Sequence, residues 1–177
     1  MKLILLYGAP GTGKYTVATE LAKITEYTLF HNHVILNALS DIFGFNHPVR
    51  KKLEKEFRLR IIEEAVVANI NIIVTGVIMR DNEAFYRQML RNVEEGEGKC
   101  FLVHLTASRE VLEDRIQNDS RKNMNKISSK ERLQEWSEEY PESFERIDFS
   151  KQITLNTSKL SPTEISKEIM SKLSLVE

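Results

Sequence analysis

The architecture follows from one segment, Gly8-Ala9-Pro10-Gly11-Thr12-Gly13-Lys14-Tyr15-Thr16, which comes directly after the apolar run at residues 2–7. Glycines in a turn between a strand and a helix let backbone N–H groups surround phosphate oxygens closely, and the helix adds the positive end of its dipole. The spacing G-x-x-x-x-G-K adds Lys14 as a mobile positive charge for the terminal phosphates. We therefore predict a nucleotide phosphate loop whose binding residues are Gly8, Gly11, Thr12, Gly13, Lys14, Tyr15 and Thr16.

Outward from this loop, short apolar runs alternate with longer stretches of helical periodicity. The predicted strands are residues 2–7, 27–30, 71–75, 99–105 and 152–155. Such alternation indicates crossover units and a mostly parallel sheet with helices on both faces. The predicted buried stripes of three helices are Val17, Leu21 and Ile24, then Leu53, Phe57, Ile61 and Ala65, then Phe85, Met89 and Val93.

A last helix is predicted from its start signal. Ser161-Pro162-Thr163-Glu164 combines an N-cap serine, a proline in the first turn and a glutamate that can bond back to the cap. Ile165, Ile169 and Leu173 then supply its buried stripe.

Composition bounds the class of protein. The 177 residues are 41% hydrophobic and 29% charged, and no linker or repeat divides them, which predicts one globular domain over residues 1–177. No apolar run approaches the roughly 20 residues that a membrane span requires. A formal charge of −1 disfavours nucleic acid as a partner.

Cys100 is the single cysteine and lies in an apolar run, which predicts a buried thiol and an intracellular, cytoplasmic location. We expect a monomer or homodimer.

The loop resembles the G-x-P-G-x-G-K-x-T loop of adenylate kinases, and the order of elements is similar to that of nucleoside monophosphate and shikimate kinases over almost the whole chain. This resemblance to the P-loop kinase superfamily implies a three-layer α/β/α fold with a five-stranded parallel sheet. It also implies a substrate-side helical region at about 34–70, a mobile basic lid at about 117–132, and ATP with Mg²⁺ as cofactors.

Two positions depart from the family pattern where the metal is organised. Tyr15 stands where a Ser or Thr often meets Mg²⁺, and a phenol is a poor ligand for that ion. Thr75 stands where many relatives carry an acid that orients the waters of the metal. We expect phosphates and waters to hold much of the Mg²⁺, with Thr16 as the protein ligand or as a phosphate contact.

Two histidines follow the second predicted strand in the segment Phe30-His31-Asn32-His33. They occupy the place of the Asp-x-Asp of shikimate kinases, so the resemblance implies that His33 is the base facing the acceptor and that His31 is an outer group at the substrate. An imidazole, with an ordinary pKa of about 6.5, accepts a proton readily near neutral pH. Two alternatives are a zinc pair on one face of an extended strand and a purely structural pair that bonds neighbouring loops.

Three arginines are candidate substrate ligands. Arg58 resembles the arginine with which shikimate kinases grip the substrate carboxylate, and a guanidinium fork suits a carboxylate or phosphate. The alternative is a solvated Arg58 on a highly charged helix. Arg80 loosely resembles a substrate-phosphate arginine of adenylate kinases, and Arg132 loosely matches an arginine that returns to the substrate after the lid.

The resemblance places the start of the lid at Arg115 and Arg121. Six Lys or Arg against two acids between Arg115 and Arg132 predict a cationic flap that closes over ATP and stabilises charge during transfer. The alternative is a solvated loop without function. Arg115 also lies at the edge of an apolar helix face, where it needs an anionic partner, either a phosphate or a neighbouring carboxylate. From position alone, Asn156 and Thr157 are predicted to border the adenine base.

These features predict an ATP-dependent phosphotransferase that moves the γ-phosphoryl group to a hydroxyl of a small-molecule acceptor, in the manner of shikimate kinase. The predicted catalytic residues are Lys14, His33, Arg115 and Arg121. One alternative is a nucleoside monophosphate kinase, and another is a nucleotide-binding regulatory ATPase without a dedicated acceptor. A kinase of nucleic-acid 5′ ends is disfavoured by the near-neutral charge.

Overall fold

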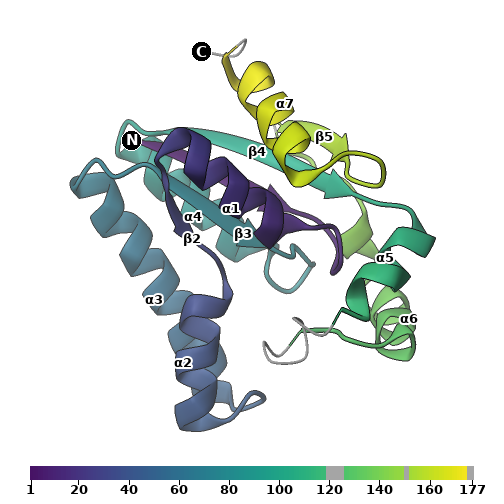
Figure 1. Cartoon of the computed structure of the whole chain (residues 1–177). Coiled ribbons are helices and arrows are strands. Elements are labelled where there is room, and N and C mark those ends of the chain that lie inside the picture. The colour runs from purple at the N-terminus through teal and green to yellow at the C-terminus, as the bar shows by residue number, and fades with distance from the viewer. Residues whose placement is uncertain (119–125, 150–151, 175–177) are drawn as a thin grey trace.

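The fold is a parallel sheet between two layers of helices (Figure 1). A computed structural model describes residues 1–118, 126–149 and 152–174 of the chain. Its five strands are all parallel and lie in the order β2-β3-β1-β4-β5, which confirms the predicted fold class. Their bounds, each within two residues of the prediction, are β1 Lys2–Tyr7, β2 Thr28–Phe30, β3 Ile72–Gly76, β4 Lys99–Thr106 and β5 Gln152–Asn156.

Each strand is followed by at least one helix before the next strand begins, which is the order that parallel crossover units require. The α-helices are α1 Lys14–Thr25, α2 His33–Phe43, α3 Pro48–Val67, α4 Glu83–Glu95, α5 Arg109–Ile116, α6 Lys130–Glu139 and α7 Pro162–Ser174, and a 3₁₀-helix, η2, spans Pro141–Phe144. Helices α2 and α3 fall in the region where the substrate-side helices are expected. In the described part of the chain, no helix combines the length and the apolar character of a membrane span.

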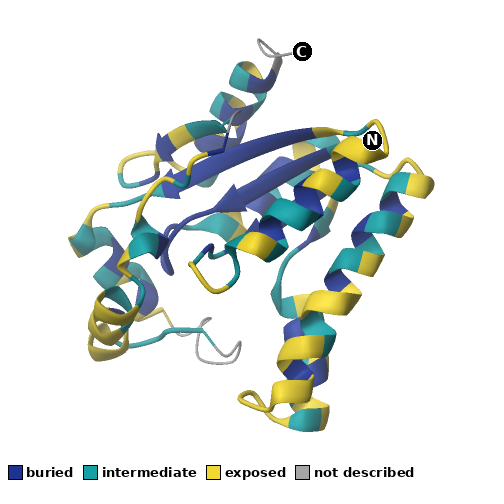
Figure 2. Ribbon diagram, turned by 180° about the vertical axis from the view of Figure 1, so that it is seen from behind, coloured by how far each residue is buried: buried dark blue, intermediate teal, exposed yellow. Residues whose placement is uncertain are grey.

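The central strand β1 divides the core into two halves. Leu3 and Leu5 belong to the cluster formed with α3 and α4, whereas Ile4 and Leu6 belong to the cluster formed with α1 and α7. Because both faces are covered, successive residues of β1 are apolar and buried rather than alternating with polar ones. Figure 2 shows the buried central strands between the partly exposed helices.

The register of the sheet brings three connecting loops together. Tyr7 at the end of β1 pairs with Gly76 of β3 on one side and with His104 of β4 on the other. Since β1 is joined to β3 and β4 rather than to β2, the strand order reverses here, and ligands of open α/β sheets bind at such a point. Helices α2 and α6 lie on opposite sides of this edge (Figure 1).

Two predicted helix faces are partly wrong. Ile24 is 49% exposed and Phe57 is 45% exposed. In α3 the buried face is turned so that Arg58 and Ile62 lie inward, because Arg58 finds aromatic and acidic partners there. The last helix is as predicted: Ser161 and Glu164 bond each other reciprocally, and the stripe Ile165, Ile169 and Leu173 is buried. Cys100 is also buried, and burial raises the pKa of its thiol to about 12.

Candidate active site

The phosphate loop joins β1 to α1 in a conformation that requires glycine. Gly8 has φ +140°, and a Cβ there would collide with the carbonyl oxygen of Leu105 in β4. Gly13 has φ +85° and precedes the first turn of α1. L side chains adopt such φ values rarely, so the glycine pattern identified in the sequence is a backbone requirement of this turn.

Lys14 curls back over the loop. Its Nζ donates hydrogen bonds to the carbonyl oxygens of Gly8 and Ala9, both at 2.7 Å. The buried hydroxyl of Thr12 donates to the same Ala9 oxygen at 2.9 Å and helps to fix the turn. The ammonium is therefore held at the mouth of the loop, where a phosphate chain would meet it.

A cavity of about 730 Å³ opens over this loop. It brings together most of the predicted nucleotide residues with His33 and Arg115, from both sides of the strand edge. Its walls are formed by residues 10–17, by Asn32, His33, Phe45, Thr75 and Val77, by Asp114, Arg115, Asn118, Lys126, Ile127 and Trp136, and by Thr157, Leu160, Pro162 and Ile165. Six predicted site residues of the described ranges do not line it: Gly8, His31, Arg58, Arg80, Arg132 and Asn156.

Arg115 is bound to the loop that follows β5. Its Nη1 donates to the hydroxyl of Thr157 at 2.8 Å, and its Nη2 donates to the carbonyl oxygen of Thr157 at 2.7 Å. Burial lowers the pKa of Arg115, and the nearby Asp114 opposes that shift. Thr157, which is 1% exposed, lies at the cavity wall, whereas Asn156 accepts a bond from the Ser158 N–H and shapes the turn.

The two histidines do not share an extended strand. Strand β2 ends at Phe30, the chain turns, and His33 is the first residue of α2, which removes the strand geometry on which a zinc pair depended. The rings of His31 and His33 lie 6.3 Å apart. Among the described residues, no group of three His, Cys, Asp or Glu side chains could hold a metal ion. The strand-based zinc alternative is therefore wrong for this pair.

His31 lies behind the cavity wall. Its Nδ1 is buried and has no hydrogen-bond partner within the described ranges. Burial lowers the pKa of His31, and the positive charge of Lys126 lowers it further. The ring of Tyr15 packs against His31 nearly at a right angle, with the ring centroids 4.9 Å apart. His31 is thus a neutral ring in contact with the phosphate loop.

Asn32 and Thr75 form a pair at the cavity wall that the sequence analysis missed. The backbone N–H of Asn32 donates to the Thr75 hydroxyl, and that hydroxyl donates to Oδ1 of Asn32, both at 3.4 Å. The pair forms because β2 and β3 are neighbours in register, with Phe30 opposite Val74. The contact between Asn32 and Thr75 can therefore be predicted only once it is known that β2 pairs with β3.

The oxygen atoms around the phosphate loop could bind Mg²⁺ only together with the phosphates of a nucleotide. The cavity presents neutral oxygens from Thr16, Asn32 and Thr75, and among its described residues Asp114 is the single acid. Mg²⁺ in nucleotide sites is held through one or two carboxylates together with waters and substrate phosphates. Neutral oxygens therefore suit an ion that arrives on the phosphates and that the protein contacts weakly, as expected from Tyr15 and Thr75.

Arg58 is packed inside the molecule. It is 5% exposed, and its guanidinium lies 5.0 Å from the ring centroid of Phe85 and 5.6 Å from that of Tyr86. Glu54 lies 4.0 Å from Arg58 and also forms an ion pair with Arg50 at 2.5 Å. The alternative of a solvated Arg58 is wrong; its role as a substrate ligand stays a prediction.

Arg80 and Arg132 are exposed. The backbone N–H of Arg80 donates to Glu142 at 3.1 Å, and the Arg132 side chain pairs with Glu135 at 3.2 Å. Their assignment to the substrate stays a prediction. Arg121 lies outside the described residues, as do the other residues between 119 and 125 of the expected lid.

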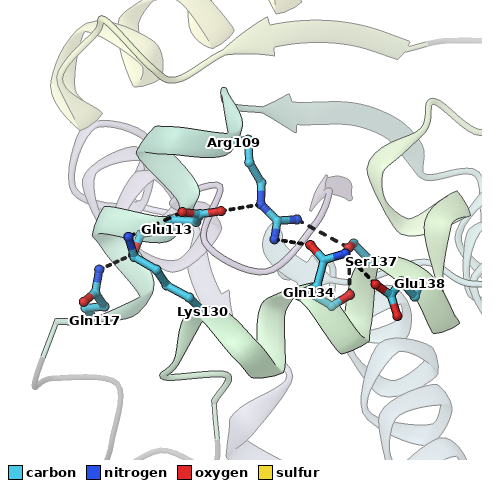
Figure 3. Close-up of polar contacts among 7 residues, drawn as sticks. All are labelled: Arg109, Glu113, Gln117, Lys130, Gln134, Ser137 and Glu138. Atoms are coloured by element: carbon cyan, nitrogen blue, oxygen red, sulfur yellow. Dashed lines mark hydrogen bonds and ion pairs between the residues drawn. The ribbon is translucent and has the colours of Figure 1, made fainter.

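Polar contacts attach α6 to α5 (Figure 3). Arg109 pairs with Glu113 at 2.7 Å and reaches across to Gln134 at 2.7 Å, and Lys130 pairs with the same Glu113 at 3.4 Å. Beneath them, Leu133 of α6 packs with Leu112 and Ile116 of α5. This attachment holds Trp136 at the cavity wall, although the sequence analysis did not include Trp136 among the site residues.

Residues 4–137 match the model of a family described as an AAA domain. Solved structures share the fold over nearly the whole chain. A gluconokinase from Sinorhizobium meliloti 1021 superposes with a TM-score of 0.68 and 16% identity, covering 99% of this chain and 93% of that one. A shikimate kinase from Acinetobacter baumannii, in complex with shikimate, gives 0.64 and 18%, covering 99% and 94%. A sugar kinase from Janibacter sp. HTCC2649 gives 0.67 and 14%, covering 98% and 94%.

Proposed function

The chain belongs to the AAA domain family and has the fold of P-loop kinases, and we propose that it is an ATP-dependent phosphotransferase that moves the γ-phosphoryl group to a hydroxyl of a small molecule. The observation that carries this proposal is the shared cavity: Lys14, His33 and Arg115 reach it from three different connections of the sheet. A donor and an acceptor held in one cavity meet with little loss of freedom at the reacting step.

The nucleotide end of the proposed site lies between the phosphate loop and the segment after β5. The loop amides and Lys14 bind the β- and γ-phosphates, and Thr157 with Asn156 borders the base. Arg115 adds positive charge from the side of α5 while Thr157 fixes its direction. Arg121 is proposed to add a further charge from the expected lid. Positive charge that is already oriented stabilises the negative charge that spreads over the transferred group.

The acceptor end lies beneath α2. His33 at the first position of α2 orients the acceptor hydroxyl and takes its proton as the phosphoryl group arrives. Thr16, together with Asn32 and Thr75 through water, would hold Mg²⁺ on the nucleotide, where the ion neutralises phosphate charge. Arg58, Arg80 and Arg132 stay proposed substrate residues, and the similarity to kinases of gluconate and shikimate supports a polyhydroxylated acceptor.

A second candidate function is a nucleotide-binding regulatory protein that hydrolyses ATP slowly. It is favoured by one observation, the replacement of metal-organising groups by Tyr15 and Thr75 in the cavity wall. A nucleoside monophosphate kinase differs from both in needing a nucleotide as acceptor.

ADP release, measured with ATP, Mg²⁺ and a panel of sugars, sugar acids, hydroxy acids and nucleoside monophosphates, separates these functions. The proposed kinase accelerates ADP release with at least one hydroxyl acceptor, whereas release at the background rate with every acceptor favours the regulatory protein. Lys14→Ala is expected to abolish ATP binding by calorimetry. Lys23→Ala is the matched control, since Lys23 is an exposed lysine of the same helix that pairs with Glu20. Unchanged ATP affinity in Lys14→Ala would refute the nucleotide site.

A further inference from the structure

Tyr15 has contacts that its position after Lys14 does not explain. Its side chain is 39% exposed and lines the cavity from the first turn of α1. On the acceptor side, its ring packs at 89° against His31, with centroids 4.9 Å apart. The Nζ atom of Lys126 lies over the same ring, 4.9 Å from its centroid. One ring thus connects the phosphate loop with the turn before α2 and with the segment that leads into α6.

The contact with Lys126 has the geometry of a cation–π interaction. An ammonium within about 6 Å of an aromatic centroid is attracted by the negative face of the ring. Lys126 itself lines the cavity, so the ring of Tyr15 determines where along the wall this charge lies. Long lysine side chains otherwise sample many rotamers, and a fixed contact removes part of that freedom before a ligand arrives.

We propose that Tyr15 is a positioning residue that holds the ammonium of Lys126 beside the phosphate loop, where Lys126 binds the terminal phosphates of the nucleotide as a further catalytic residue. This role rests on the proposed phosphotransfer and assigns a function to the tyrosine that replaces the usual metal-binding hydroxyl. Lys14, Arg115 and Lys126 then face the phosphates, with Asp114 the single acid among the described wall residues. Fixed cations would then supply part of the charge neutralisation that phosphoryl transfer requires.

The behaviour of His31 supports the arrangement. The pKa of His31 is lowered by burial first and by the charge of Lys126 second, so the ammonium lies close enough to act on the imidazole. A neutral His31 completes the packing of Tyr15 without repelling Lys126. The ring is therefore supported on one side and carries the cation on another.

Six variants test this role by equilibrium ATP binding and by single-turnover ADP release: Tyr15→Phe, Tyr15→Leu, Tyr15→Ser, Lys126→Met, Lys126→Arg and the double variant Tyr15→Leu/Lys126→Met. We expect Tyr15→Phe, which keeps the ring, to stay within about twofold of the wild type. Tyr15→Leu and Lys126→Met should each slow ADP release roughly three- to tenfold, the size of a cation–π contribution. The double variant should be no slower than the slower single variant, because both remove the same interaction.

Three outcomes would overturn the role. They are losses that multiply in the double variant, a loss in Tyr15→Phe as large as in Tyr15→Leu, and wild-type rates in Tyr15→Ser, which restores the hydroxyl of other phosphate loops. Lys126→Arg is the rescue variant, since a guanidinium also binds an aromatic face. ATP binding needs no acceptor, so the coupling between Tyr15 and Lys126 is measurable in the affinity even if no acceptor is found. If the wild-type protein does not bind ATP, that result would instead refute the nucleotide site itself.

Discussion

Arg115 of α5 and Thr157 of the loop after β5 are joined by two hydrogen bonds, one to the hydroxyl at 2.8 Å and one to the carbonyl oxygen at 2.7 Å. The same hydroxyl contacts the carbonyl oxygens of Thr12 and Thr106, both at 3.1 Å. A single buried threonine therefore ties the phosphate loop, the end of β4 and the start of the expected lid to one point. A change at Thr157 is therefore expected to affect the positions of all three segments.

Thr157→Val is expected to lower the free energy of unfolding by about 1–3 kcal/mol, because the isosteric change leaves buried polar partners unsatisfied. ATP affinity should fall as well, since Arg115 and Thr12 lose their common contact. Chemical denaturation and calorimetry measure the two effects. Thr154→Val, at an exposed position of the adjacent strand β5, is the control and should change neither. Equal behaviour of the two variants would contradict the role of Thr157.

His33→Gln is expected to reduce phosphoryl transfer about 10²-fold, the lower end for loss of general base catalysis. ATP affinity should stay within about twofold, because the phosphate loop and Arg115 are unchanged. Single-turnover kinetics and equilibrium binding separate the two effects. His47→Gln, at an exposed histidine that does not line the cavity, serves as the control. If transfer and ATP binding fall by the same factor, His33 is not acting as a base.

Thr75→Asp should strengthen metal binding to the protein–ATP complex on the order of tenfold, the size of effect that groups oriented around a metal produce. The reason is that a carboxylate would replace a neutral hydroxyl at the cavity wall. Mn²⁺ titration followed by electron paramagnetic resonance measures this affinity without turnover. Thr154→Asp on the surface controls for added charge. An unaltered Mn²⁺ affinity would show that Thr75 does not face the metal.

His104 makes the protein sensitive to acid. Its ring is 3% exposed and stacks on Tyr7, and neither ring nitrogen has a hydrogen-bond partner within the described residues. Burial lowers the pKa of His104 to about 4, and the charges of Arg146 and Lys14 contribute. An unfolded histidine titrates near 6.5, so the unfolded chain binds more protons between the two values. The contribution of His104 to the free energy of unfolding should therefore be complete above pH 6.5. The free energy of unfolding should then fall by up to about 3 kcal/mol as the pH drops to 4.

His104→Phe keeps the stacked ring and removes the titrating group. Denaturation at pH 7.5, 5.5 and 4.5 should show a smaller loss of stability in this variant than in the wild type. If the stability of His104→Phe depends on pH in the same way as that of the wild type, His104 is not the source of the acid sensitivity.

Much of the fold could be predicted from the sequence because its main signals are local. Strands buried on both faces appear as continuous apolar runs, and the phosphate loop is a glycine requirement of one turn. The end of β2 at Phe30 was predicted as well, but the conformation of the two histidines after it was not, since nothing local requires the helix to begin at His33.

The rest of the site depends on tertiary partners. Arg58 faces inward because Glu54 pairs with its charge and Phe85 and Tyr86 cover its guanidinium. A periodicity analysis assigns charged residues to the solvent and therefore misses such a face. The pair Asn32 and Thr75 likewise exists only through the neighbouring register of two strands.

Lys14 is bound to the carbonyl oxygens of Gly8 and Ala9, within its own loop. The lysine is thus satisfied internally, so the turn needs no phosphate to hold its shape. We therefore expect the protein to fold, and to present its phosphate loop ready for binding, in the absence of nucleotide.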